Sequence, residues 1–110
     1  MLLNNKVTVV VPSTIGLDAA PADIIIETVE GALAALARVA GGSTAVDAMG
    51  AWIDDRGHLV RERVCNVYAY CTDSQRPWVV KAARRVAADI KQVMTQEAVA
   101  IIINGTMEFI

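Results

Sequence analysis

His58 is the only histidine of the chain and the first candidate for acid–base chemistry, because imidazole titrates near neutral pH. Asp54 and Asp55 shortly precede it and Glu62 follows it, so carboxylates could lie beside the ring. A turn histidine between charged residues usually faces solvent, and solvated side chains are the simpler interpretation. We therefore predict no catalytic residue and no metal site here.

A second pair of carboxylates, Asp47 and Glu62, would lie on one face of a predicted hairpin, where two carboxylates can share a proton or bind a cation. The expected strand register makes them diagonal neighbours, which favours solvated or Arg-bonded carboxylates. The sequence shows no Ser-His-Asp or Cys-His arrangement. Gly41-Gly42 follows a predicted helix instead of preceding one, so no phosphate-binding loop is expected. We predict no cofactor.

The cysteines, Cys65 and Cys71, fall on one predicted strand. At that spacing they would be about 20 Å apart, far beyond the reach of a disulfide. We expect two free, structural thiols.

Tyr68 and Tyr70 alternate as a base-stacking platform would, but the other signs of nucleic-acid binding are absent. The net charge is −2, aromatic residues make up only 5% of the chain, and no Gly-aromatic-Val signature occurs. We predict that the chain does not bind nucleic acid.

Patterns of apolar residues define the elements that would position these side chains. Strands are predicted where β-branched and aromatic residues cluster, and helices where apolar residues recur every three or four positions. The predicted order is a strand over 6–12, a loop over 13–21, a helix over 22–40, strands over 43–53 and 58–72, a helix after Ser74, and strands over 98–103 and 106–110. Asn104-Gly105 is a strong hairpin signal between the last two strands.

A four-residue turn over 54–57 would pair Ile53 with His58, and therefore Val46 with Cys65 and Asp47 with Val64. One face of this hairpin would then be core, and the other would be mixed. The predicted core face holds Val46, Cys65, Val67, Ala69 and Cys71, and the mixed face holds Asp47, Met49, Glu62, Val64, Asn66, Tyr68 and Tyr70.

The order β-α-β-β-α-β predicts an α+β fold, a ferredoxin-like split sheet with an extra C-terminal hairpin strand and both helices on one face. The length of 110 residues suits a single domain. The chain is 55% hydrophobic, yet no apolar run reaches the ~20 residues of a membrane-spanning helix, so no membrane association is predicted. The first residues do not resemble a secretory signal, and a cytoplasmic location is expected.

Several short motifs resemble a family of small uncharacterised bacterial proteins, some of them carried on mobile elements. The motifs are Gly50-Ala51-Trp52, the segment 57–62, Gln96-Glu97-Ala98-Val99, and the ending from Asn104-Gly105 to Phe109-Ile110. The resemblance covers roughly residues 43–110. It supports the fold and implies no activity.

Two functions remain open from the sequence. The leading hypothesis is a non-enzymatic interaction protein that forms a homodimer, with another protein as a further partner; the alternative is a small-ligand-binding domain or a cofactor-free enzyme. In the dimer, a second copy would cover the half-apolar sheet face around Val64, Tyr68 and Tyr70. The short edge strand over 106–110 offers a competing route to the dimer. The candidate ligand- or partner-binding residues are Trp52, His58, Glu62, Val64, Tyr68 and Tyr70.

Overall fold

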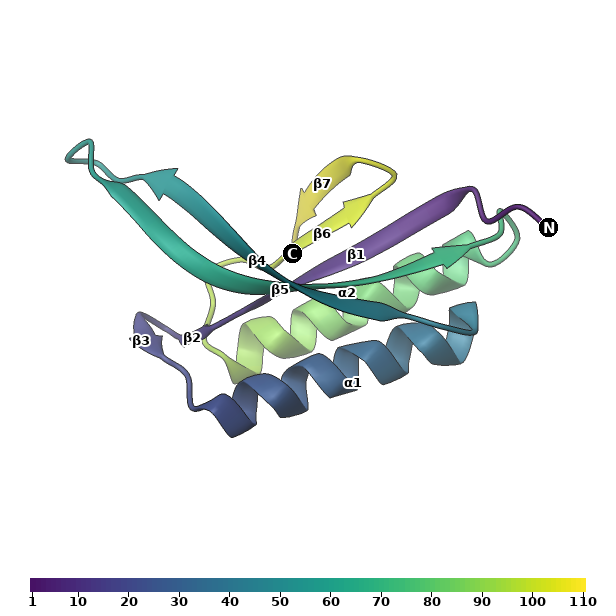
Figure 1. The fold of residues 1–110 in the computed structure, drawn as a ribbon, viewed down its shortest axis with the longest axis horizontal. Coiled ribbons are helices and arrows are strands. Elements are labelled where there is room, and N and C mark those ends of the chain that lie inside the picture. The colour runs from purple at the N-terminus through teal and green to yellow at the C-terminus, as the bar shows by residue number, and fades with distance from the viewer.

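The computed structural model describes residues 1–110 and consists of a five-stranded antiparallel sheet with two long helices on one face (Figure 1). The elements are β1 (Asn5–Pro12), β2 (Thr14–Ile15), β3 (Asp18–Ala19), α1 (Ala22–Ala40), β4 (Thr44–Ile53), β5 (Leu59–Cys71), α2 (Arg76–Val93), β6 (Ala100–Ile103) and β7 (Thr106–Phe109). The sheet order is β4-β5-β1-β6-β7. This confirms the predicted ferredoxin-like α+β fold and the extra C-terminal strand. None of the helices is both long and apolar enough to cross a membrane.

The two helices begin and end where their sequences predict. Pro21 precedes α1, and Gly41 ends it with φ 95°, donating its N–H to the carbonyl of Ala37. A left-handed residue at this point is typically glycine, since it has no Cβ to clash. Pro77 lies in the first turn of α2, where a missing N–H leaves no hydrogen bond unmade.

The core lies between the sheet and the two helices. Val7, Val9 and Val11 alternate along β1 and are fully buried against the helices, and Leu36 of α1 is buried with them. On β5 the same face carries Cys65, Val67, Ala69 and Cys71, all buried as predicted. The opposite face of the sheet, which we call the open face, carries no helix (Figure 1).

The predicted pairing of β4 with β5 is wrong by one residue. Ile53 pairs with Leu59, so Asp47 lies opposite Cys65 and Val46 lies opposite Asn66. The loop is longer than a four-residue turn because the Asp54 carboxylate accepts hydrogen bonds from the N–H groups of Arg56 and His58. A slip of one residue turns every side chain of a strand to the other face.

This shift changes the sheet face of the β4 side chains and leaves those of β5 as predicted. Val46, predicted as core, belongs to the open face and is 47% exposed. Asp47 and Met49, predicted on the mixed face, lie on the helix side. Asp47 and Glu62 are therefore on opposite faces of the hairpin and cannot act as a pair.

The predicted loop over 13–21 contains a small hairpin, β2–β3, which forms a separate two-stranded sheet. Each of its strands has only two residues, too few to show an alternating pattern. The hairpin lies at the same end of the molecule as the tip of the β4–β5 hairpin (Figure 1).

Candidate functional site

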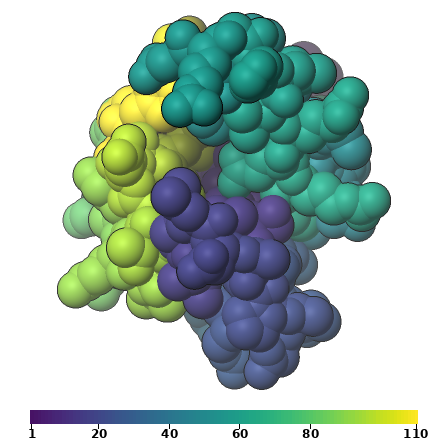
Figure 2. Space-filling model, turned by 90° about the vertical axis from the view of Figure 1, so that its left-hand side faces the viewer, coloured from purple at the N-terminus to yellow at the C-terminus, as the bar shows by residue number.

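A pocket of about 380 Å³ opens at that end of the molecule, between the β4–β5 hairpin, the end of β1 and the start of α1. In the space-filling view it lies in the hollow between the β4–β5 hairpin and the β2–β3 hairpin (Figure 2). Its lining residues are Val11, Pro12, Ser13, Ile25, Asp47, Ala48, Met49, Arg63, Val64 and Cys65. This volume falls within the ~300–1,000 Å³ range of small-molecule sites.

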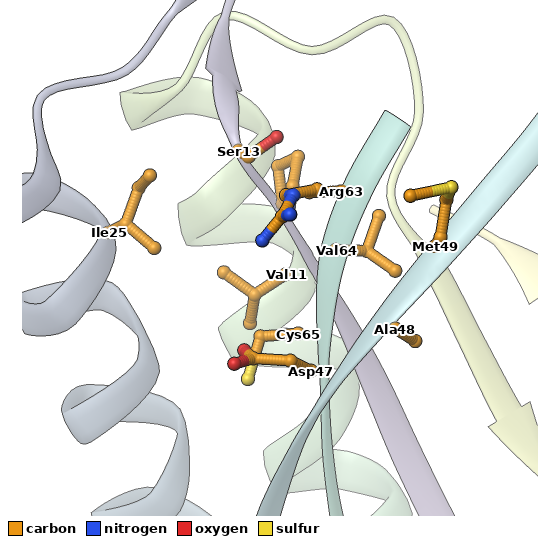
Figure 3. Close-up of a pocket in the computed structure, with 10 residues that line it drawn as sticks. Val11, Ser13, Ile25, Asp47, Ala48, Met49, Arg63, Val64 and Cys65 are labelled. Atoms are coloured by element: carbon orange, nitrogen blue, oxygen red, sulfur yellow. The ribbon is translucent and has the colours of Figure 1, made fainter. Parts of the chain in front are cut away.

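Two charged side chains line this pocket. Asp47 of β4 and Arg63 of β5 project from the sheet toward α1, on the side where Ile25 lies (Figure 3). They do not form an ion pair, since the ion pairs of the chain are His58–Asp54 and Arg84–Glu108. An exposed carboxylate and an exposed guanidinium with no partner in the chain can bind a ligand that carries both charges.

The rest of the pocket wall is largely apolar. Val11 comes from β1, Ile25 from α1 and Met49 from β4. Apolar walls with a few charged groups are the usual composition of a small-molecule site.

Cys65 also lines the pocket, beside Asp47 (Figure 3). Cys65 is only 7% exposed. Burial raises the pKa of the Cys65 thiol, and the negative charge of Asp47 raises this pKa further. The thiol therefore stays protonated near neutral pH and is a poor nucleophile.

Cys71 is likewise buried and free, and burial is the main cause of the raised pKa of its thiol. The absence of a disulfide and the burial of both cysteines confirm the prediction of structural thiols.

The six candidate binding residues do not form one site. Five of them, Trp52, Glu62, Val64, Tyr68 and Tyr70, occupy open-face positions of β4 and β5. Of these five, Val64 also lines the pocket. Their role in binding stays a prediction.

His58 lies apart from these residues, in the loop at the tip of the hairpin. Its side chain is 72% exposed, and Nδ1 lies 3.8 Å from the Asp54 carboxylate. No group of three or more His, Cys, Asp or Glu side chains lies close enough together to hold a metal ion.

The tyrosines form a cluster with Lys6 on the open face. The two rings meet edge to face with centroids 5.8 Å apart, and the Lys6 ammonium lies 4.3 Å from the centroid of Tyr68. A shallower hollow adjoins them at the end of α1, where Gly41, Gly42 and Ser43 lie. Because Lys6 already occupies the face of Tyr68, this cluster is less suited to a cationic ligand than the pocket that contains Asp47.

Of the charged residues of the pocket, Asp47 was interpreted from sequence as a solvated or Arg-bonded carboxylate, and Arg63 was assigned no role. Both side chains lie at the same pocket only because of the register of the β4–β5 hairpin and the packing of α1 beneath it. A carboxylate between small residues, Val46-Asp47-Ala48, is the one local signal that the sequence offers.

The sequence matches no protein-family model and no curated protein. Two solved structures share the fold. A phage SAM lyase in complex with S-methyl-5'-thioadenosine aligns with a TM-score of 0.67 and 18% identity, over 96% of this chain and 88% of that chain. A phage SAM lyase in its apo state aligns with a TM-score of 0.64 and 15% identity, over 97% of this chain and 88% of that chain.

This likeness contradicts the leading hypothesis from the sequence. A non-enzymatic, self-associating interaction protein was expected, whereas these two similar structures are both of a phage SAM lyase, an enzyme. The sequence contains no catalytic signature of the usual kinds, and that absence led to the wrong conclusion.

Proposed function

We propose that this chain is a lyase that cleaves S-adenosylmethionine (SAM) and releases S-methyl-5'-thioadenosine. The observation that carries the proposal is the match of nearly the whole chain to a phage SAM lyase, one copy of which holds S-methyl-5'-thioadenosine. The proposed site is the pocket between the β4–β5 hairpin and α1, which has apolar walls for the adenosine part of SAM and one carboxylate and one guanidinium for its charged amino acid end.

The charges of the substrate suit those of the pocket. The amino acid end of SAM carries an ammonium and a carboxylate, which Asp47 and Arg63 can bind respectively. The adenine ring needs an apolar surface, and Val11, Ile25 and Met49 provide one. This arrangement would orient the bond between the sulfur and the amino acid chain.

The reaction itself requires few chemical groups from the protein. When this C–S bond breaks, its electron pair goes to the sulfonium sulfur, which becomes the neutral thioether. The four-carbon fragment completes its valence through attack of its own carboxylate on the same carbon, or through loss of a proton from the neighbouring carbon. The first route requires no base from the protein, so a site without a catalytic histidine is chemically sufficient.

The apolar walls favour the reaction on electrostatic grounds. The sulfonium charge disappears as the bond breaks, so an environment of low polarity raises the free energy of the reactant more than that of the transition state. The ammonium keeps its charge throughout, and its binding to Asp47 holds the substrate in both states.

The experiment is the incubation of the purified chain with SAM, followed by chromatography for S-methyl-5'-thioadenosine. The wild type should form the product, and Arg63→Gln should lower kcat/KM by about ten- to 150-fold, because a charge-assisted hydrogen bond contributes ~1.5–3 kcal/mol. Arg61→Gln is the matched control, since Arg61 lies on the same strand and face outside the pocket. Equal loss in both variants, or no product from the wild type, would contradict the proposal.

The predicted homodimer is a separate part of this proposal. The open face exposes Val46, Trp52, Met107 and Phe109, each about half exposed or more, and so presents an apolar surface without a covering layer. A second copy could cover this surface through a two-fold contact. Replacing Val64 and Tyr68 by glutamate should then yield a monomer in sedimentation. If the double variant stays dimeric while deletion of residues 106–110 dissociates it, the edge strand β7 is the contact instead.

A further inference from the structure

The β2–β3 hairpin directly follows a residue that lines the pocket. Ser13, at its base, is a pocket residue, and its carbonyl accepts a hydrogen bond from Ala20, which closes the hairpin. The hairpin pairs with no strand of the main sheet, and Leu17 at its tip is fully exposed. Ile15 of the hairpin packs against the core. The other contacts that join the hairpin to the rest of the chain are hydrogen bonds.

These contacts converge on the connection between α2 and β6. The N–H of Gly16 donates to the carbonyl of Met94 at 2.9 Å. The side-chain amide of Gln96 donates from Nε2 to the carbonyl of Thr14 at 2.9 Å and to that of Met94 at 3.0 Å, and its distance to Thr14 Oγ1 is 3.3 Å. The side-chain amide of Gln96 and the N–H of Gly16 thus join the hairpin to the end of α2.

We propose that Gln96 is a positioning residue for the pocket. It acts through Thr14 on the neighbouring Ser13 and so fixes the wall against which the ligand lies; the inference rests on the proposed function for the identity of that ligand. The amide is the chemically necessary group, because it donates two hydrogen bonds to two carbonyls. A glutamate of the same shape is ionised at neutral pH, accepts only, and would face both carbonyl oxygens.

The test compares Gln96→Glu with Gln92→Ala. Gln92 is an exposed glutamine at the end of α2 that makes no side-chain hydrogen bond within the chain, and so it serves as the control. S-methyl-5'-thioadenosine is titrated into each protein in a calorimeter, and KM and kcat for SAM are measured. Gln96→Glu should weaken binding and raise KM about tenfold with kcat little changed, because a misplaced wall removes binding common to substrate and transition state.

A double-mutant cycle with Ser13→Ala identifies the route. If Gln96 acts through the wall that Ser13 forms, the two substitutions together should weaken binding less than the sum of their separate effects. Effects that simply add, a Gln96→Glu variant that binds like Gln92→Ala, or a loss confined to kcat would each overturn the inference.

Hydrogen exchange at Gly16 separates this inference from the proposed function, because it needs no ligand. Its amide should exchange faster in Gln96→Glu than in the wild type, as the hairpin detaches from Met94. If the wild type binds no S-methyl-5'-thioadenosine, the proposed function fails, and the exchange of Gly16 still decides whether Gln96 holds the hairpin. Unchanged exchange would overturn the positioning role.

Discussion

Replacing Asp47 with cysteine should produce a disulfide with Cys65, whereas replacing Val46 should not. In the structure Asp47 lies directly opposite Cys65. Hydrogen-bonded and non-hydrogen-bonded pairs alternate along the ladder, and the bond from Asp54 to His58 places Asp47–Cys65 in a non-hydrogen-bonded pair. In such a pair the Cα atoms are about 4.5 Å apart, within the range of a disulfide. The side chain of Val46 lies on the other face and cannot reach Cys65.

The expected gain in stability follows from the length of the closed loop. About 19 residues lie within the loop from position 47 to position 65. Closing a loop of that length in the unfolded chain stabilises the fold by about 3 kcal/mol on the chain-entropy estimate. For a domain of this size that corresponds to a rise in Tm of roughly 12 °C.

The assay is performed in a Cys71→Ser background, so that Cys65 is the only possible partner. Air-oxidised Asp47→Cys should lose its free thiols and two hydrogen masses, and its Tm should fall when a reductant is added. Val46→Cys in the same background should keep both thiols. A disulfide in Val46→Cys and none in Asp47→Cys would refute the register, and with it the placement of Asp47 in the pocket.

Two further predictions concern charge and packing. Asp47→Asn should speed labelling of the Cys65 thiol at a fixed pH below the pKa of that thiol, because the Asp47 charge raises this pKa and its loss increases the thiolate fraction. The labelling rate of Cys71 should not change. Equal acceleration of both thiols would indicate a general loosening of the fold instead. Leu36→Ala should lower the free energy of unfolding by about 2–5 kcal/mol in urea denaturation, because Leu36 is fully buried, whereas Ile26→Ala, at a residue 57% exposed, should cost about 0.5 kcal/mol or less. Similar losses at both positions would contradict the assigned face of α1.

The secondary structure of this chain could be predicted because each long element carries its own signals. The periodic apolar positions of α1 and the glycines after it define both of its ends. The β2–β3 hairpin was not predicted, because strands of two residues show no periodicity. The family resemblance and the cytoplasmic location stay predictions.

The pocket could not be predicted, because it depends on the length of the loop between β4 and β5, which is one residue longer than the predicted turn. The Asp54 side chain binds two N–H groups of the loop and lengthens it, which turns Asp47 toward α1. Sequence alone favours the shorter turn, which would leave Asp47 on the mixed face and the pocket without its carboxylate. The enzyme hypothesis came second in the sequence analysis because the sequence shows no catalytic signature of the usual kinds. The intramolecular cleavage proposed above would need no histidine, metal or activated nucleophile, and so would leave no such signature.

The most direct test of the proposed site is an NMR titration of the isotope-labelled chain with S-methyl-5'-thioadenosine. The backbone amides of Val11, Ser13, Ile25 and Met49, which line the walls proposed to hold the adenosine part, should shift together and saturate with one dissociation constant, while those of Tyr68 should move little. Shifts confined to Tyr68, Tyr70 and the neighbouring end of α1, or no shift at saturating ligand, would contradict the assignment of the pocket.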